Sequence, residues 1–172
     1  MDLSNDDWEQ SLREYDESSR SERVRRARYF TDTMPEHDRL SSADAAAMWY
    51  DYQMSYSLGL FAATVVIGLT IIEGMISEYA RTQGIGEMGL SRTLRALQGK
   101  QHPFREQVPK IKELADIRNG FIHGRELLDD RGVGGKRFLK HKGNMDAVME
   151  GLGTEMVDLV ATMISKALAS KK

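Results

Sequence analysis

Apolar residues recur at helical spacing along most of the chain, and this pattern predicts helices rather than strands. A long helix is predicted over residues 144–169, where the apolar side chains step by four and three residues. These side chains are Met145, Met149, Leu152, Met156, Leu159 and Met163. A second helix is predicted from Pro109 to His123, because proline is accepted in a first helical turn and a glycine follows as a stop. A shorter helix is predicted over about residues 88–98.

The most apolar part of the chain lies between residues 41 and 83. Ser41 followed by Asp44 matches a capping box, so we expect a helical stretch that begins there and ends near residue 83. Because no formal charge occurs between Asp51 and Glu73, a membrane span and the buried central helix of a bundle both fit this stretch. Its polar N-terminal end and acidic flanks, without a lysine or arginine anchor, favour the buried helix and predict no membrane association.

Two polar segments interrupt this pattern. Residues 1–40 are rich in Asp, Ser and Arg and predict a short amphipathic helix followed by an arm. The apolar positions of that helix are Trp8, Leu12 and Tyr15. Residues 125–143 predict a hairpin or a loop before the last helix. We therefore expect an N-terminal helix and arm over residues 1–40 and an all-α helical bundle over residues 41–172.

Composition narrows the chemistry further. The chain has 172 residues, no cysteine and a net charge of −2, which excludes disulfides, thiolate nucleophiles and thiolate metal sites. The four histidines are too widely spaced for a helical metal pair, and we expect neither a metal nor another cofactor. The acidic start of the chain does not resemble a signal peptide, so a cytoplasmic location is expected.

The charges are unevenly distributed along the chain. Residues 1–40 carry a net charge of −4, whereas residues 91–172 carry +6. A basic C-terminal half is attracted to nucleic acid phosphates, although a solvated helix face and a lysine-rich loop explain the excess equally well. The candidate phosphate contacts are Lys136, Arg137, Lys140 and Lys142.

The helix predicted over residues 109–123 contains a conflict. Its apolar residues form one face, and Arg118 points into the middle of that face. These apolar residues are Ile111, Leu114, Ala115 and Ile122. A guanidinium left unpaired in an apolar setting costs several kcal/mol, on the order of 3 or more, so Arg118 requires a carboxylate, or the face must open onto a cleft rather than a sealed core. Glu73, the first charge after the apolar stretch, is the predicted partner, in a pair that is either structural or part of a site.

Asn119 and His123 lie one helical turn apart beside Arg118. A histidine can act as general base on a ribose 2′-hydroxyl or as acid on the leaving oxygen. An arginine can neutralise the charge that builds up on a pentacoordinate phosphorus. The three residue types therefore suit phosphodiester chemistry that requires no metal, although a lone helical histidine is also common as a surface residue.

The run Arg118-Asn119-Gly120-Phe121-Ile122-His123 resembles the Arg-x4–6-His signature of the HEPN superfamily, in its Arg-Asn-x-x-x-His form. The order of elements is also similar: a long apolar helix that carries an acid, the motif helix, a variable insert and a closing helix. The resemblance covers about residues 41–170. It implies a compact HEPN-like helical bundle that forms a homodimer through the motif helices, with one composite cleft between the two motifs.

The resemblance also implies a function. Many members of the superfamily are metal-independent endoribonucleases that leave a 2′,3′-cyclic phosphate and a 5′-hydroxyl, and they act as toxins or in anti-phage defence. Carried over, Arg118 and His123 would be catalytic, Asn119 would orient them and Glu73 would fix Arg118. The implied partners are RNA and an antitoxin or a protein of a defence complex. Other members are catalytically silent dimerisation modules that bind a partner protein or a nucleotide, and this alternative stays open.

Overall fold

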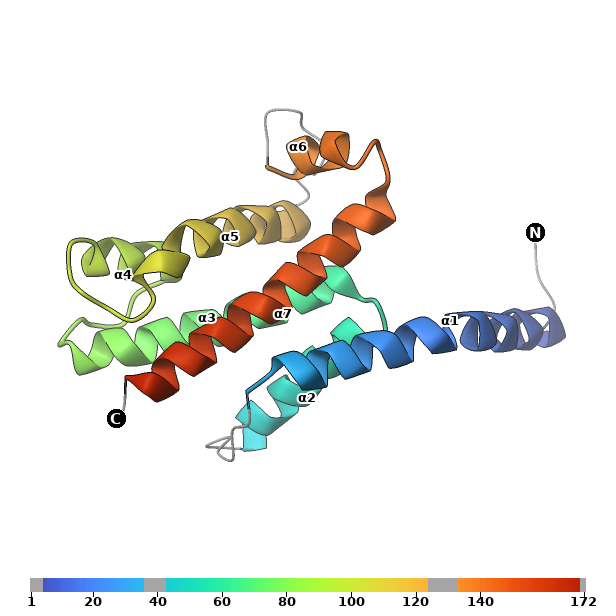
Figure 1. The fold of residues 1–172 in the computed structure, drawn as a ribbon, viewed down its shortest axis with the longest axis horizontal. Coiled ribbons are helices and arrows are strands. Elements are labelled where there is room, and N and C mark those ends of the chain that lie inside the picture. Colours follow the sequence, from blue (N-terminus) through green and yellow to red (C-terminus); the bar gives the residue numbers. More distant parts are fainter. Residues whose placement is uncertain (1–4, 36–42, 124–132, 171–172) are drawn as a thin grey trace.

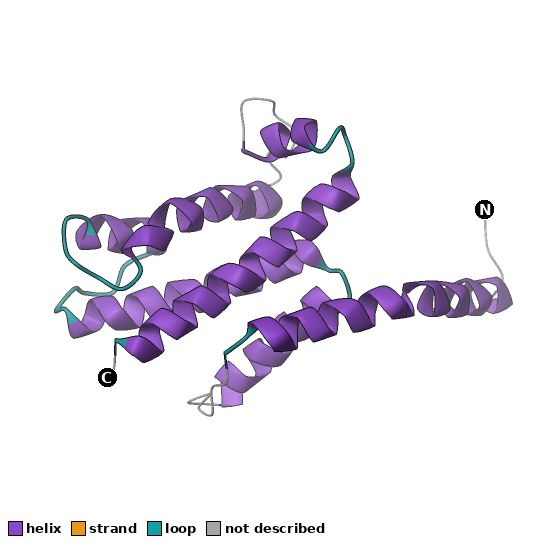
Figure 2. Ribbon diagram, viewed as in Figure 1, coloured by secondary structure: helices purple, strands orange, loops and turns teal. Residues whose placement is uncertain are grey.

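The computed structural model describes residues 5–35, 43–123 and 133–170, and within these ranges helices joined by loops and turns make up the fold, without a strand (Figure 2). The predicted all-α bundle is therefore confirmed. The elements are α1 (Asn5–Thr33), α2 (Ala43–Ser57), α3 (Phe61–Thr82), α4 (Leu90–Leu97), the 3-10 turn η1 (Arg105–Gln107), α5 (Val108–His123), α6 (Val133–Lys140) and α7 (Met145–Ala169).

Helices α3 and α7 form the centre of the bundle and pack most extensively on each other (Figure 1). α3 also contacts α2, α4 and α5. The residues at this centre are at most 1% exposed; they include Val65, Leu69, Ile72 and Ile76 of α3 and Leu152, Met156, Val160 and Met163 of α7. Gly68 of α3 and Gly153 of α7 lie on these facing surfaces, and the absence of a side chain at both positions lets the helices approach closely.

In the part of the chain that the structure describes, α3 is the one helix long and apolar enough to cross a membrane. A third of its most apolar 18-residue window is buried within the protein. Its four neighbouring helices place it at the core of the bundle, as the buried-helix interpretation predicts.

The helical stretch predicted over residues 41–83 is not continuous. α2 ends at Ser57 and α3 begins at Phe61. Gly59 adopts a positive φ of 78°, the backbone N–H of Leu60 donates to the carbonyl oxygen of Ser55 at 2.8 Å, and that of Gly59 donates to Tyr56 at 3.0 Å. This pair of hydrogen bonds around a left-handed glycine is a Schellman motif, which ends α2 without a proline. The serine of the predicted capping box lies outside the described residues.

The N-terminal helix is much longer than predicted, because α1 runs for 29 residues instead of giving way to an arm. Its C-terminal half packs on the bundle, where Phe30 is 2% exposed and contacts the rings of Trp49 and Tyr52. Arg26 donates from Nε to the carbonyl oxygen of Ser57 at 3.2 Å. The N-terminal half of α1 extends beyond the other helices (Figure 1).

The segment predicted as a hairpin or loop before the last helix contains α6, a short helix that includes Gly134 and Gly135. Two glycines argue against a helix, but contacts with α5 and α7 outweigh this low propensity. The prediction for α7 is confirmed, and Asn144 caps its first turn by accepting a hydrogen bond from the backbone N–H of Ala147 at 3.0 Å.

Candidate functional site

α5 is held in the bundle by one apolar face. Ile111 and Leu114 are fully buried, as predicted, and Ile117 is 4% exposed. The sequence interpretation missed Ile117, which shifts the centre of the buried face away from Arg118. The side chain of Arg118 is accordingly 21% exposed rather than sealed in the core.

Arg118 faces Glu73 of α3, the partner predicted from the sequence. Nη1 of Arg118 lies 3.7 Å from Oε2 of Glu73. The other carboxylate oxygen of Glu73 accepts a hydrogen bond from the backbone N–H of Leu90 at 2.8 Å. Glu73 therefore joins the motif helix to the first turn of α4, where a negative charge also complements the helix dipole.

Arg118 retains hydrogen-bonding capacity. Its Nη2 donates to the side-chain oxygen of Asn119 at 3.3 Å. Its Nε is buried and has no hydrogen-bond partner within the described part of the chain. The guanidinium of Arg118 has five N–H donors but makes only these two long contacts within the described residues, to Glu73 and to Asn119. An anionic group beside Arg118 would accept hydrogen bonds from the remaining donors. His123 is the last residue of α5, and its side chain lies outside the described residues.

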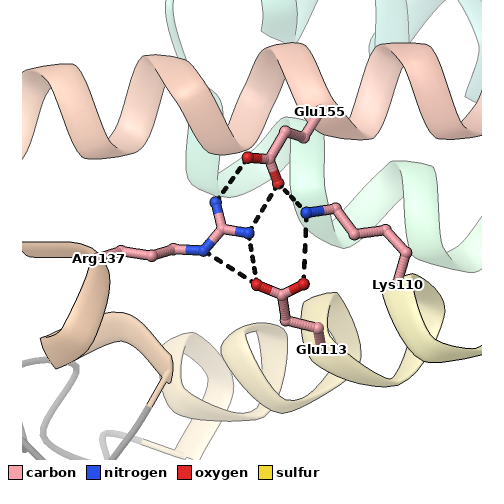
Figure 3. Close-up of polar contacts among 4 residues, drawn as sticks. All are labelled: Lys110, Glu113, Arg137 and Glu155. Carbon is pink, nitrogen blue, oxygen red and sulfur yellow. Dashed lines mark hydrogen bonds and ion pairs between the residues drawn. The ribbon is translucent and has the colours of Figure 1, made fainter. Parts of the chain in front are cut away.

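A second charged cluster lies on another face of α5, and Figure 3 shows its four members between α5, α6 and α7. Arg137 of α6 donates to Glu113 from Nε at 3.2 Å and from Nη2 at 2.5 Å. It also donates to Glu155 from Nη1 and Nη2, both at 2.8 Å. Lys110 pairs with Glu113 at 3.3 Å and also with Glu155. We call these four residues the α6 clamp.

The α6 clamp changes the titration of its members. Burial alone would raise the pKa of Glu113 and of Glu155, but the hydrogen bonds and charges of Arg137 and Lys110 outweigh burial and lower both pKa values below 4.5. Burial would likewise lower the pKa of Arg137, and the two carboxylates raise it instead. The clamp is therefore fully ionised at neutral pH and holds α6 on the bundle.

The predicted phosphate contacts separate into two groups. Lys136, Lys140 and Lys142 are exposed and form no ion pair within the described residues, so their ammonium groups are accessible. Arg137 is turned inward, is 17% exposed and is saturated by two carboxylates. Its place in the α6 clamp argues against the predicted contact with RNA, because a phosphate would have to displace both glutamates.

Sequence reasoning missed three members of the α6 clamp, namely Lys110, Glu113 and Glu155. The only local signal is the spacing of Lys110 and Glu113, which suits an ion pair on one helix face. Among the residues that the structure describes, no group of three or more histidine, aspartate or glutamate side chains lies close enough to hold a metal ion.

No protein-family model, curated protein or solved structure matches this chain. The likeness to the HEPN superfamily therefore rests on the motif and on the order of the helices. Independently of that likeness, the geometry places an arginine, an amide and an acid together where α3, α4 and α5 meet.

Proposed function

We propose that the protein is a metal-independent endoribonuclease of the HEPN type, which acts as a homodimer in the cytoplasm in toxin activity or anti-phage defence. In this reaction the ribose 2′-oxygen attacks the adjacent phosphorus and the bond to the 5′-oxygen breaks. The products are a 2′,3′-cyclic phosphate and a 5′-hydroxyl. His123 takes the proton from the 2′-hydroxyl or gives one to the leaving oxygen, and Arg118 stabilises the additional negative charge.

The observation that carries this proposal is the environment of Arg118. The guanidinium is held from one side by Glu73 at 3.7 Å and by Asn119 at 3.3 Å, while one fifth of the side chain remains exposed. A purely structural arginine is expected to look like Arg137, with its donors saturated by carboxylates. Arg118 instead keeps unused donors, as expected for a residue that receives a phosphate.

Helix geometry supports the proposed homodimer. Arg118 and His123 are five residues apart on α5, so their positions are about 140° apart around the helix axis and lie on different faces of one copy. Two facing copies of α5 would bring Arg118 of one copy towards His123 of the other. The exposed lysines of α6 and of the turn after it, Lys136, Lys140 and Lys142, would then contact the RNA backbone on the same side of the bundle as α5.

The proposal is tested by incubating purified protein with total RNA in excess EDTA and analysing the ends of the products. Wild type is expected to produce cyclic phosphate ends, and His123→Ala is expected to produce none. His141→Ala is the matched control, because His141 is an exposed histidine in the turn after α6. This variant should cleave RNA as wild type does.

Cleavage that persists in His123→Ala with the same end chemistry would refute the assignment of the site. RNA that stays intact in every sample would favour the alternative function, a silent helical module that binds a partner protein or a nucleotide. Affinity capture with the wild-type chain would then identify the partner, for which an antitoxin or a protein of a defence complex is the expectation under both functions.

A further inference from the structure

The N-terminal half of α1 carries an uncovered apolar stripe. Trp8, Leu12 and Tyr15 are 56%, 62% and 62% exposed, although large apolar side chains usually find cover in a folded protein. Every residue from Asp7 to Ser18 is exposed. This half of the helix projects past the bundle (Figure 1), and within the described part of the chain only the Tyr15 end of the stripe borders the bundle, at the edge of a groove.

The stripe continues a packing face that is already in use. Positions 8, 12, 15, 19, 26 and 30 step by three, four or seven residues and fall on one side of a helix. At the C-terminal end of this side, Arg26 is 9% exposed and Phe30 is 2% exposed, and both pack on the bundle. This face of α1 is therefore buried where it packs on the bundle and exposed where the helix projects past the bundle. The continuity of the face indicates that a second bundle covers its exposed part.

The charges of α1 are segregated along its length. Residues 5–19 hold six acidic residues and one basic residue, whereas residues 20–33 hold five arginines and two acidic residues. Arg20 and Arg28 are exposed and form no ion pair within the described residues. A helix with one acidic and one basic half is complementary to an antiparallel copy of itself and repels a parallel copy.

The bundle offers a largely apolar groove next to α1, which Asp146 and Glu150 also line, the latter paired with Arg25. A groove of about 660 Å³ runs beside the helix from Tyr15 to Arg26. The turn between α2 and α3 forms much of its floor, where Leu58 and Leu60 are 37% and 56% exposed and Phe61 is partly buried. In an antiparallel pair of α1 helices, the projecting half of one copy lies over this groove of the other.

We propose that this protein self-associates through α1: the stripe Trp8, Leu12 and Tyr15 of each copy packs into the groove beside α1 of the other, with the two helices antiparallel. The contact is twofold symmetric, so each copy covers the stripe of its partner. It lies on the α1–α2 side of the bundle, away from α5, and is independent of the ribonuclease proposal (Figure 1).

The test is the mass of the full chain by sedimentation velocity over a range of concentrations. Leu12→Asp is expected to halve the mass and to raise the dissociation constant at least about 100-fold, because each pair loses two leucine contacts and buries two carboxylates. Gln10→Asp is the matched control, since it places the same residue on the opposite, outward face of α1 and should leave the mass unchanged. Raised salt should weaken the association, because part of it is electrostatic.

A fall in mass from a dimer to a monomer supports the proposal, and so does a fall from a larger assembly to a dimer where α5 also pairs two copies. A wild-type chain that is monomeric at all concentrations, or a mass that Leu12→Asp leaves unchanged, would overturn it. Equal unfolding temperatures for Leu12→Asp and wild type, at a concentration where both are monomeric, exclude misfolding as the cause, since Leu12 is 62% exposed within its own chain.

Fluorescence gives an independent measurement. The chain has two tryptophans, and in Trp49→Phe the only remaining one is Trp8. Its emission should shift to shorter wavelength as the concentration rises, and Leu12→Asp should abolish that shift. An emission maximum typical of exposed tryptophan at every concentration would contradict the contact.

Discussion

Glu73 has two partners, and its two carboxylate oxygens can be tested separately. One accepts the backbone N–H of Leu90 and the other pairs with Arg118. Glu73→Gln keeps an acceptor for Leu90 and removes the charge, so we expect a loss of at most about 1 kcal/mol in the free energy of unfolding. Glu73→Ala removes both contacts and should cost about 1–2 kcal/mol, because the first turn of α4 also loses its cap. Urea unfolding of both variants measures the difference.

Equal losses in the two variants would contradict a role of Glu73 in capping α4. The exposed Glu78→Ala, in the same helix, is the control for helix propensity and should stay within about 0.5 kcal/mol of wild type. The same variants also bear on the proposed site, because Glu73→Gln frees Arg118 to move while α4 stays capped.

The sequence predicts the pair of Arg118 and Glu73 because each is an isolated charge on an otherwise apolar helix face. It does not predict the partners of Arg137, since Glu113 and Glu155 lie 24 and 18 residues away on two other helices. Local spacing reports which face of a helix a charge occupies, but not which helix packs on that face. The sequence therefore groups Arg137 with the neighbouring lysines, although Arg137 alone among them is turned inward.

At the scale of elements, the contact between α3 and α7 depends on glycine. A Cβ at Gly68 would lie 2.6 Å from Sδ of Met156 and 3.1 Å from Cε2 of Tyr52, whereas Gly74 of the same helix has open space around it. Gly68→Ala should lower the free energy of unfolding by about 1–3 kcal/mol through overpacking. Gly74→Ala should raise it by about 0.5–1 kcal/mol, because alanine is the better helix former.

Urea unfolding of the two variants tests this pair, and opposite signs are the expected outcome. Stabilisation by both substitutions would mean that α3 and α7 are not closely packed at Gly68. Both variants introduce the same methyl group into the same helix. The difference between their free energies of unfolding therefore separates the effect of packing from that of helix propensity.

The α6 clamp predicts a pH dependence. The pKa values of Glu113 and Glu155 lie below 4.5 in the folded protein, so their contribution is complete above that pH and is lost as the pH falls through the lowered values. Arg137→Met should cost about 1–2 kcal/mol at pH 7, less than a fully buried pair, since about a third of each carboxylate side chain is exposed. The cost should shrink as the pH falls through the lowered pKa values of Glu113 and Glu155, because protonation removes the charges that Arg137 pairs with.

Unfolding in urea between pH 3 and pH 7 measures this cost. Lys140→Met, an exposed position on the same helix, should stay within about 0.5 kcal/mol of wild type at every pH. If the cost of Arg137→Met does not change with pH, it comes from lost packing rather than from the ion pairs.

The sequence predicts helices well where an apolar stripe repeats over several turns, as in α5 and α7. It predicts elements poorly where tertiary contacts decide the local structure. The end of α2 depends on the left-handed Gly59 and its hydrogen bonds, and α6 is helical despite two glycines because the clamp anchors Arg137. Neither feature has a periodic signal that could reveal it.

At the scale of the whole molecule, the bundle presents two dissimilar sides. α1 and α2 lie on one side of the central pair α3 and α7, and α4 and α5 lie on the other (Figure 1). The inferred contact through α1 and the proposed contact through α5 therefore use separate surfaces. A chain with two such twofold contacts would assemble beyond a dimer, and loss of the α1 contact would leave the α5 pair intact.

Subunit mixing tests whether the proposed active site is shared between copies. Arg118→Ala and His123→Ala should each be inactive, but a mixed pair holds one intact Arg118 and one intact His123 on opposite copies. Because these residues diverge by about 140° on one helix, the productive combination should come from two copies. Random mixing makes half of the pairs mixed. Each mixed pair keeps one of the two Arg118–His123 combinations that the wild-type cleft contains, so about a quarter of the wild-type cleavage rate should return. Mixtures as inactive as the separate variants, in a protein whose wild type cleaves RNA, would place Arg118 and His123 of the same copy in one site.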